Sequence, residues 1–323
     1  MNAADWRPAA SLTTLRTRAR MLAAAREYFS DEGVIEVDTA LLSRAAVTDI
    51  HLESVPATVA GVGPMYLHTS PEYAMKRLLA AGIGDCYQVS HVFRDGERGA
   101  QHNPEFTLIE WYRLGFDVSA LMDDVEALVA RVLEGLRPLA RAERTTYREA
   151  VRGASGVDPM TATAAEIATA LRAHGVDAPP TALDDGDALL DLLVSTVVGP
   201  RLGAPRPSFI HDYPASQAAL ARIRPGDFPV AERFELYLDG IELANGFHEL
   251  GDAVEQRRRF EADLAHRAAV GKPPRPVDER LLAALSHGLP DCAGVALGFD
   301  RLVMAALGLD SIDQAMPFAV DRA

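Results

Sequence analysis

Two arginines stand in local contexts that suit the binding of a nucleoside triphosphate. Arg94 follows an alternating stretch at 86–93, and Arg301 follows Gly298-Phe299-Asp300 near the C-terminus. A guanidinium stays charged and can donate two parallel hydrogen bonds to phosphate or carboxylate oxygens. Asp300 is a candidate helix N-cap, and the free N–H groups of a helix start would add to the positive field at Arg301. We therefore predict an ATP clamp; arginines paired with surface carboxylates are the alternative.

The segment after Pro104 predicts a strand with one polar face. Alternation places Phe106, Leu108, Glu110 and Tyr112 on the same side of the sheet. An aromatic ring, a carboxylate and a phenol suit a pocket for a flat base and a cationic amine. A half-exposed strand with incidental polar residues is an equal alternative at this point.

Asp239-Gly240 has the composition of a two-residue hairpin turn. Pairing Leu238 with Ile241 would place Glu235 and Glu242 on one face as diagonal neighbours, roughly 7–8 Å apart. Two carboxylates in such positions can share a magnesium ion that bridges phosphates. The alternative is that both are solvated on an edge hairpin.

The run Thr69-Ser70-Pro71-Glu72 predicts the start of a helix, since it combines a capping hydroxyl, an early proline and an acidic first turn. Glu72 has two interpretations. Its carboxylate can satisfy the helix start as part of a capping box, or it can bind an amino group of a substrate.

The elements that must position these residues alternate between helices and strands. We expect a helix at 15–29, a strand at 35–38, a helix from 72 to about 79 and strands up to about 114. Residues 118–204 predict mostly helices without a catalytic motif, and we interpret them as an insertion packed on the side of the sheet. Strand character returns at 234–250, and a charged helix follows at 253–269. Antiparallel strands with flanking helices predict a single α+β domain.

Composition excludes several other classes of protein. The chain has 32 basic and 46 acidic residues, and its net charge of −14 opposes general attraction to nucleic acid. Cys86 and Cys292 have no metal-ligand spacing and predict neither a zinc site nor a disulfide framework. The N-terminus shows no leader pattern, and no segment is apolar enough to span a membrane. We therefore expect a cytoplasmic protein.

Five motifs in order resemble the catalytic core of class II aminoacyl-tRNA synthetases. The nearest members are the lysine enzymes and their stand-alone paralogues, which attach (R)-β-lysine to translation elongation factor P. The matching motifs are 69–73, 102–107, 110–112, 240–250 and 294–302. The resemblance covers nearly the entire chain, and it implies a catalytic domain at 8–323 that contains the insertion 118–204. Only about a dozen residues precede the first core helix, so no N-terminal anticodon-binding domain is expected.

The resemblance also implies a role for each matching residue. Arg94 would bind the α-phosphate and the substrate carboxylate, and Arg301 the γ-phosphate, as the catalytic pair. Further ATP contacts are expected from Glu97, His102, Asn103, Phe106, Glu242, Leu243 and Gly298. The amino-acid substrate is expected to contact Ser70, Pro71, Glu72, Glu110, Tyr112, Asn245, Glu249 and Ala296. The family's magnesium ligands correspond to Glu235 and Glu242.

The implied reaction has two steps. The carboxylate of (R)-β-lysine or lysine attacks ATP to form an aminoacyl adenylate, and the acyl group then passes to a lysine side chain of elongation factor P. A tRNA acceptor is disfavoured by the net charge and by the expected lack of an anticodon-binding domain. The rivals are a minimal lysyl-tRNA synthetase-like ligase with another acceptor and a synthetase fold that only binds amino acids.

The chain departs from the synthetase pattern at three positions. Synthetases of this class usually have one residue between the arginine and the following glutamate. Here two residues separate Arg94 from Glu97. Ala40 stands where the dimer motif normally has proline, although a homodimer is still expected. Ala296 replaces a glycine that is usual in lysyl-tRNA synthetases. We hypothesise that its methyl group disfavours α-lysine and suits an amine shifted by one carbon.

Overall fold

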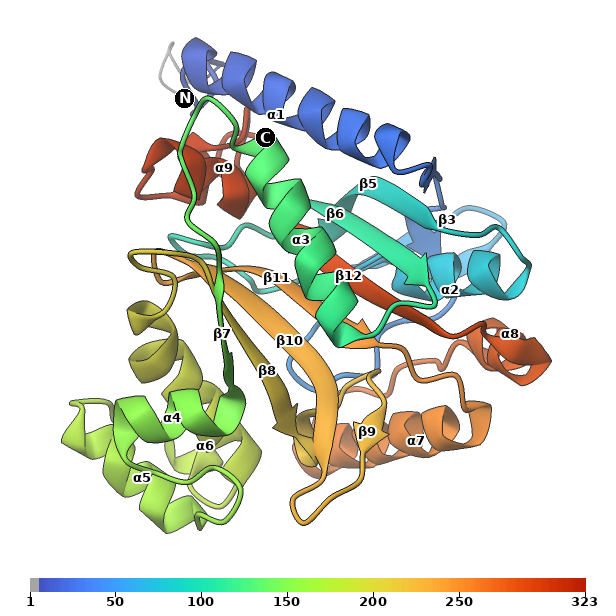
Figure 1. The fold of residues 1–323 in the computed structure, drawn as a ribbon. Coiled ribbons are helices and arrows are strands. Elements are labelled where there is room, and N and C mark those ends of the chain that lie inside the picture. The colour runs from blue at the N-terminus through green and yellow to red at the C-terminus, as the bar shows by residue number, and fades with distance from the viewer. Residues whose placement is uncertain (1–5) are drawn as a thin grey trace.

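The computed structural model describes residues 6–323. Residues 1–5, which belong to the N-terminal stretch without a leader pattern, lie outside the described residues. A large sheet forms the centre of the molecule (Figure 1). Its strands follow the order β1 (Ile35–Glu36), β5 (Cys86–Phe93), β6 (Glu105–Leu114), β12 (Cys292–Gly298), β11 (Ile241–His248), β10 (Val230–Leu238), β8 (Ser208–Pro214) and β7 (Glu143–Thr146), with β9 (Ile223–Arg224) beside β10. The six central strands pair antiparallel, whereas β1 and β7 join the two edges in parallel. The predicted α+β class is confirmed.

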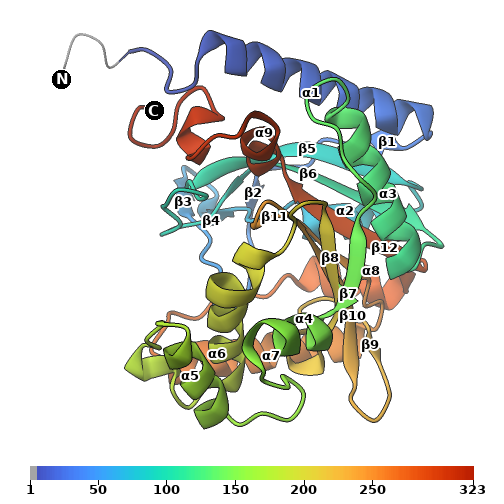
Figure 2. The same cartoon turned by 60° about the vertical axis from the view of Figure 1, so that its left-hand side comes forward.

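Three helices cover one face of this sheet: α1 (Leu12–Asp31), α3 (Val118–Val132) and α9 (Phe299–Leu307) (Figures 1 and 2). Helix α1 buries Met21, Ala25 and Phe29, which recur every four residues and so share one side of the helix. The ring of Phe29 stacks on Tyr87 of β5 at 4.2 Å between centroids and meets Trp111 of β6 edge-on. This aromatic contact fixes α1 to the sheet.

A second hydrophobic cluster gathers helices α4 (Tyr147–Ser155), α5 (Ala164–Ala173) and α6 (Gly186–Leu193) beside the β7–β8 edge (Figure 2). Short turns named η1 (Pro180–Ala182), η2 (Val194–Val198) and η3 (Gly199–Arg201) complete it. Helix α3 lies within the range 118–204 but packs with the main core instead. The domain limits 8–323 and 118–204 stay a prediction.

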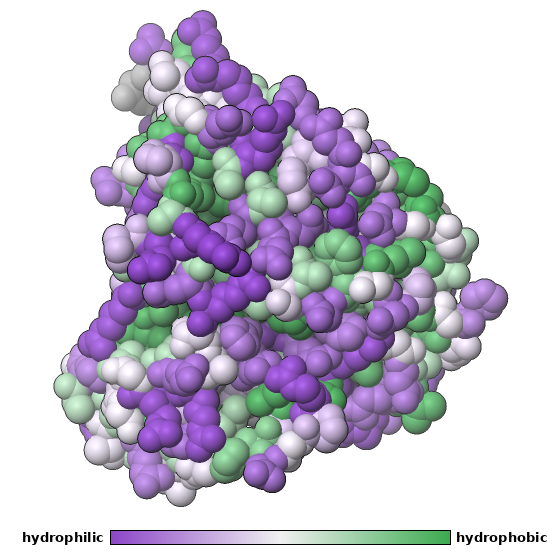
Figure 3. All heavy atoms as spheres, in the orientation of Figure 1, coloured by the Kyte–Doolittle hydropathy of each residue, from purple (hydrophilic) through white to green (hydrophobic). Residues whose placement is uncertain are grey.

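The remaining helices are α2 (Glu72–Ala80), α7 (Ala253–Ala269) and α8 (Glu279–Gly288), with short turns η4 (Ala215–Gln217) and η5 (Ile312–Gln314). Helix α8 contacts both α2 and α7. A small sheet of β2 (Leu42–Ser43), β4 (Gly63–Leu67) and β3 (Pro56–Val59) precedes α2. Within residues 6–323, the helices are either too short or too polar to cross a membrane. On the face shown in Figure 3, hydrophilic residues predominate and hydrophobic ones form separate patches.

Candidate active site

A cavity of about 1180 Å³ opens on the sheet face opposite α1, α3 and α9. The alternation of β6 explains its position: Ile109 and Trp111 face the hydrophobic core, so Phe106, Glu110 and Tyr112 face the cavity. The lining includes these predicted site residues: Ser70, Pro71, Glu72, Arg94, Glu97, His102, Asn103, Phe106, Glu110, Tyr112, Glu242, Leu243, Asn245, Glu249, Ala296, Gly298 and Arg301. Glu235 is absent from the lining. The volume is sufficient for a nucleotide and a small amino acid together.

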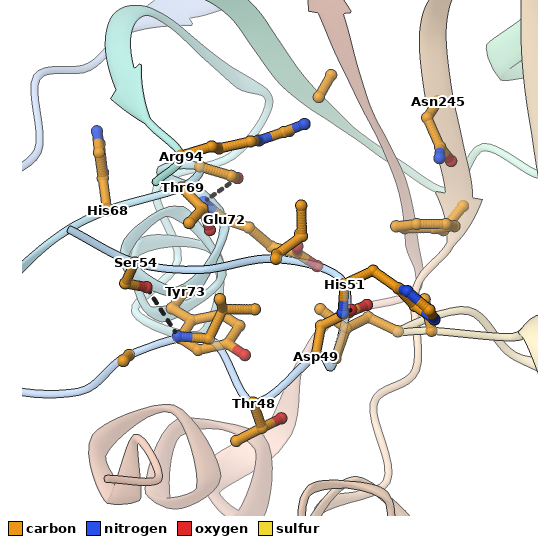
Figure 4. Close-up of a pocket in the computed structure, with 18 of the residues that line it drawn as sticks. Thr48, Asp49, His51, Ser54, His68, Thr69, Glu72, Tyr73, Arg94 and Asn245 are labelled. Atoms are coloured by element: carbon orange, nitrogen blue, oxygen red, sulfur yellow. Dashed lines mark hydrogen bonds between the residues drawn. The ribbon is translucent and has the colours of Figure 1, made fainter. Parts of the chain in front are cut away.

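Figure 4 looks into this cavity and shows the elements that supply its walls. Arg94 reaches in from the end of β5, Asn245 from β11 and Glu72 from the start of α2. The loop of residues 44–54, which carries Asp49 and His51, borders the opening. No motif in the sequence predicts a role for this loop.

The arginine end of the cavity is built from Arg94 and Arg301. The guanidinium of Arg94 lies over the ring of Phe106, 5.0 Å from its centroid. Arg301 donates from Nε to the carbonyl of Gln101 at 3.1 Å and from Nη1 to that of Glu242 at 3.1 Å. Its Nη2 lies 2.8 Å from Nε2 of His102. Burial and the charge of Arg301 lower the pKa of His102, so the neutral imidazole accepts this hydrogen bond.

Asp300 does not cap helix α9, which corrects the sequence-based expectation. The N-cap position is Gly298, and Asp300 lies in the first helical turn. Its buried carboxylate accepts from the backbone N–H of Thr107 at 2.6 Å and pairs with Arg18 at 2.7 Å. The carboxylate therefore ties α9 to β6 and α1, which fixes the backbone next to Arg301.

The inner end of the cavity is acidic. Glu110 accepts from the hydroxyls of Ser70 at 2.7 Å and Tyr112 at 2.8 Å. Burial, and then the nearby Glu72, raise the pKa of Glu110 to about 8. The same hydroxyl of Ser70 accepts from the backbone N–H of Glu72 at 3.0 Å, as expected for the start of α2.

Glu72 does not form a capping box. Its carboxylate accepts from Nζ of Lys76, one helical turn further along α2, at 2.8 Å. The same Nζ forms an ion pair at 2.6 Å with Glu249, which follows β11. Burial raises the pKa of Glu249 to about 7, although Lys76 opposes the shift. Among the described residues, Oε1 of Glu249 has no hydrogen-bond partner.

Strand β12 forms the floor between the two ends. Ala296 lies opposite Glu110 of β6 and Asn245 of β11, so its methyl group sits between two predicted substrate contacts. Gly294 lies opposite Tyr112, and a Cβ there would approach Tyr112 Cε1 to 2.3 Å and Glu249 Oε1 to 2.4 Å. Only glycine therefore leaves space for both side chains.

The predicted turn between β10 and β11 is confirmed, since Leu238 pairs with Ile241. A β-bulge then shifts the register, so that Glu235 lies opposite Asn245. Glu235 accepts from Arg233 at 2.6 Å and from the hydroxyl of Tyr237 at 2.7 Å. Its nearly complete burial and these two bonds explain why it does not reach the cavity wall.

The two carboxylates still fit a divalent cation in charge and donor type. Desolvation within the cavity wall and then the charge of Glu235 raise the pKa of Glu242, although its side chain is 38% exposed. Glu242 lines the cavity beside Arg301, whereas Glu235 supports the site from behind. A bound cation would remove the repulsion.

The family model for class II tRNA synthetases of the D, K and N group matches residues 1–322. The chain belongs to this synthetase family. It is 48% identical to the elongation factor P–(R)-β-lysine ligase of Vibrio cholerae over 328 residues, covering 100% of both chains. It is 49% identical to the ligases of the same name from Salmonella gallinarum and Klebsiella pneumoniae, covering 99% of each chain. The predicted family is confirmed, and this synthetase-family protein is an ATP-dependent ligase.

Two residues of the synthetase's site are not predicted from the sequence: Gly294 in the cavity wall and Lys76 directly behind it. Lys76 follows Glu72 by four residues on a helix, and this spacing alone predicts an ion pair. Gly294 gives no comparable signal, because its importance depends on side chains from β6 and from the end of β11.

The loop 44–54 of the synthetase is held by a long-range ion cluster. Glu53 pairs with the buried Arg267 at 2.9 Å, with Lys272 at 3.0 Å and with Arg275 at 2.7 Å. These basic residues lie more than 200 positions further along the chain, on α7 and the segment after it. Hydrogen bonds from the three cations lower the pKa of Glu53 to about 2 despite partial burial.

The outer part of the synthetase's cavity carries several aspartates. Asp49, Asp187, Asp191 and Asp263 come from the loop 44–54, α6 and α7. Arg44, Arg258, Arg259 and Arg280 line the same cavity, so this part of the wall carries charges of both signs.

Proposed function

We propose that this ligase activates (R)-β-lysine or lysine with ATP and transfers it to a lysine side chain of translation elongation factor P. The observation that carries the proposal is the single cavity with arginines at one end and three buried or partly buried carboxylates, Glu72, Glu110 and Glu249, at the other. Such a cavity suits a nucleotide next to a doubly aminated carboxylic acid. The printed names of the relatives, which are ligases of elongation factor P, agree with this substrate pair.

In the first step, a carboxylate oxygen of the amino acid attacks the α-phosphorus of ATP. The bond from this phosphorus to the bridging oxygen breaks, and pyrophosphate leaves with the electron pair. Arg94 and Arg301 stabilise the negative charge on the phosphates, so no protein nucleophile is required. A magnesium ion would neutralise the phosphates further, with Glu242 as its ligand at the cavity wall and Glu235 as the second carboxylate behind it.

In the second step, the neutral ε-amine of the acceptor lysine attacks the acyl carbon of the adenylate. An amide forms, AMP leaves with the bridging oxygen, and the nitrogen loses a proton. Asp49, Asp187, Asp191 and Asp263 in the cavity wall are available to contact a cationic side chain. The net charge of −14 disfavours the polyanionic tRNA.

The test supplies purified protein with ATP, labelled (R)-β-lysine or lysine, and either elongation factor P or tRNA. We expect label on elongation factor P and none when its acceptor lysine is replaced by arginine. Label on tRNA alone would contradict the proposed acceptor. The absence of pyrophosphate exchange with every amino acid would support a fold that only binds amino acids.

We further propose a cytoplasmic homodimer, because translation factors act in the cytoplasm and the β1 edge of the sheet is apolar. Ile35 on β1 is exposed, as are the nearby Leu41 and Leu42. Light scattering at micromolar concentration should give twice the mass of one chain. A mass of 34.8 kDa, that of one chain, would contradict the dimer.

A further inference from the structure

Lys76 is one of only two lysines in this chain, against 30 arginines, and it lies directly behind the acidic end of the cavity. Its side chain is 1% exposed, and the residue is absent from the cavity lining. Its ammonium contacts Glu72 at 2.8 Å and Glu249 at 2.6 Å. Both carboxylates line the cavity, so Lys76 holds them from the side away from the substrate.

The charges at this end do not balance. Three carboxylates, Glu72, Glu110 and Glu249, lie within one buried group, and among the described residues Lys76 is the one basic side chain that forms an ion pair with any of them. Buried carboxylates without enough positive charge are costly and take up protons instead. One ammonium of the protein thus serves two of the three carboxylates, which leaves the group able to accept a cationic substrate.

One carboxylate oxygen of Glu249 is buried beside Gly294 and Tyr112. Oε1 of Glu249 lies in a residue that is 1% exposed and has no hydrogen-bond partner among the described residues. Its other oxygen, Oε2, meets Lys76. Lys76 thus holds the carboxylate through Oε2, while Oε1 is kept beside Gly294 and Tyr112 on the amino-acid side of the group.

We propose that Lys76 is the positioning residue of the amino-acid site: its fixed ammonium holds the carboxylates of Glu249 and Glu72 in place so that they select a diamino acid. This role rests on the proposed function, because it assigns the two carboxylates to ammonium groups of the substrate. It goes beyond that function by making selectivity depend on a residue that does not touch the substrate.

The titratable and charged groups around Lys76 come from several elements. Glu72 lies on the same helix, Glu249 follows β11, and Glu110 and Tyr112 come from β6. Cys292 on β12 and Arg222, which donates to the backbone carbonyl of Glu249, complete the surroundings. Burial disfavours the charge of Lys76, but Glu249 and Glu72 outweigh it and raise its pKa. The ammonium therefore stays charged throughout the range in which the carboxylates titrate.

The kinetic test compares wild type with Lys76→Met, which removes the ammonium but keeps an unbranched side chain only one atom shorter. We expect the KM for the amino acid to rise about tenfold or more, while the KM for ATP changes less than about twofold. Without Lys76 the pKa of Glu249 rises, so the pH at which amino-acid binding reaches half its maximum should move up by about one unit, which is a tenfold change in the ionised fraction. Lys76→Arg restores the charge and should recover part of the loss.

Lys272→Met is the matched control. Lys272 is the other lysine, and it also pairs with a carboxylate, Glu53, but on the loop outside the inner end. The Lys272→Met variant should leave the pH midpoint of amino-acid binding unchanged. Equal KM values and pH midpoints for wild type and Lys76→Met would overturn the proposal, because a purely structural ion pair would change stability alone.

A second measurement does not require Lys76 to be replaced. In a Lys272→Arg variant labelled with ¹⁵N-lysine, Lys76 gives a single side-chain nitrogen signal. Lysine should shift this signal, whereas norleucine, which lacks the side-chain amine, should leave it in place. If neither compound or both compounds shift it, the proposal is wrong even where catalysis is intact. Failure of the proposed function is seen separately, as wild type without amino-acid activation.

Discussion

The carboxylates at the inner end of the cavity differ in charge because each has different neighbours. Glu110 accepts only from two neutral hydroxyls, and burial raises its pKa to about 8. Glu249 has the ammonium of Lys76 and a pKa of about 7. At neutral pH Glu110 is therefore mostly protonated, whereas Glu249 is about half ionised until a cationic substrate binds. Residue identity alone does not reveal this division.

Ala296 should set the discrimination between β-lysine and α-lysine. Its methyl group lies between Glu110 and Asn245, and replacing it by glycine opens the cavity floor there. One methyl group typically changes selectivity by about 10–200-fold. We expect Ala296→Gly to raise kcat/KM for α-lysine about tenfold relative to (R)-β-lysine in pyrophosphate exchange. The KM for ATP serves as the internal control and should stay within about twofold; equal activation of both amino acids by wild type would contradict the hypothesis.

At the scale of elements, sequence periodicity was informative where one strand face is buried and the other is not. It predicted the shared face of Phe106, Glu110 and Tyr112 and the turn between β10 and β11, because both depend on local alternation or turn chemistry. It did not predict the bulge that moves Glu235 opposite Asn245, since a bulge depends on the packing of a neighbouring strand.

Contacts between distant segments account for most of what the sequence could not show. Asp300 has the residue type of a cap, yet its partners Arg18 and Thr107 lie about 200 or more residues away. The ion cluster of Glu53 joins segments equally far apart. Local pattern rules cannot identify such partners, although they correctly indicated helix α2 and the charged helix α7.

Strand β12 tolerates no side chain at Gly294. In Gly294→Ala the new methyl group would overlap Tyr112 and Glu249, so one or both must move away from the amino-acid site. We expect a loss of about 1–3 kcal/mol in the free energy of unfolding. The KM for the amino acid should rise more than the KM for ATP, which steady-state kinetics would measure.

The control for this change is Gly153→Ala. Gly153 lies within helix α4, and its added methyl group would meet no atom within 4 Å. Alanine is favoured over glycine inside a helix, so this variant should be as stable as wild type or slightly more stable. If Gly294→Ala bound the amino acid as wild type does, the assignment of Tyr112 and Glu249 to that site would be wrong.

For the whole molecule, the distribution of charge within the cavity matters more for substrate binding than the net charge of the chain. The chain carries a net charge of −14, yet Arg94 and Arg301 create a cationic end within a cavity whose inner end is acidic. The fields at the two ends therefore separate the triphosphate from the amino groups of the substrate. The sheet makes this separation possible because β6, β12 and β11 place side chains along one continuous surface.

This arrangement should make the stability of the substrate-free molecule depend on the ionisation of Glu110. Its pKa is about 8 in the folded state against an ordinary value of 4.5. Between these values the folded state holds a proton that the unfolded state has released. The stabilisation is complete below pH 4.5 and is lost as the pH rises to about 8, by at most about 1.4 kcal/mol per pH unit.

Urea unfolding of wild type and Glu110→Gln between pH 5 and pH 8.5 would measure this contribution. Glutamine does not titrate, and the other titrating groups are the same in both proteins. Their contributions therefore cancel in the difference between the two free energies of unfolding. The stability of wild type relative to Glu110→Gln should fall steadily up to about pH 8 and then level off. Glu105→Gln, which changes an exposed carboxylate on the same strand, should not reproduce this fall. A difference that is constant with pH would mean that Glu110 is ionised in the folded state, and the acidic end would then require a further cation.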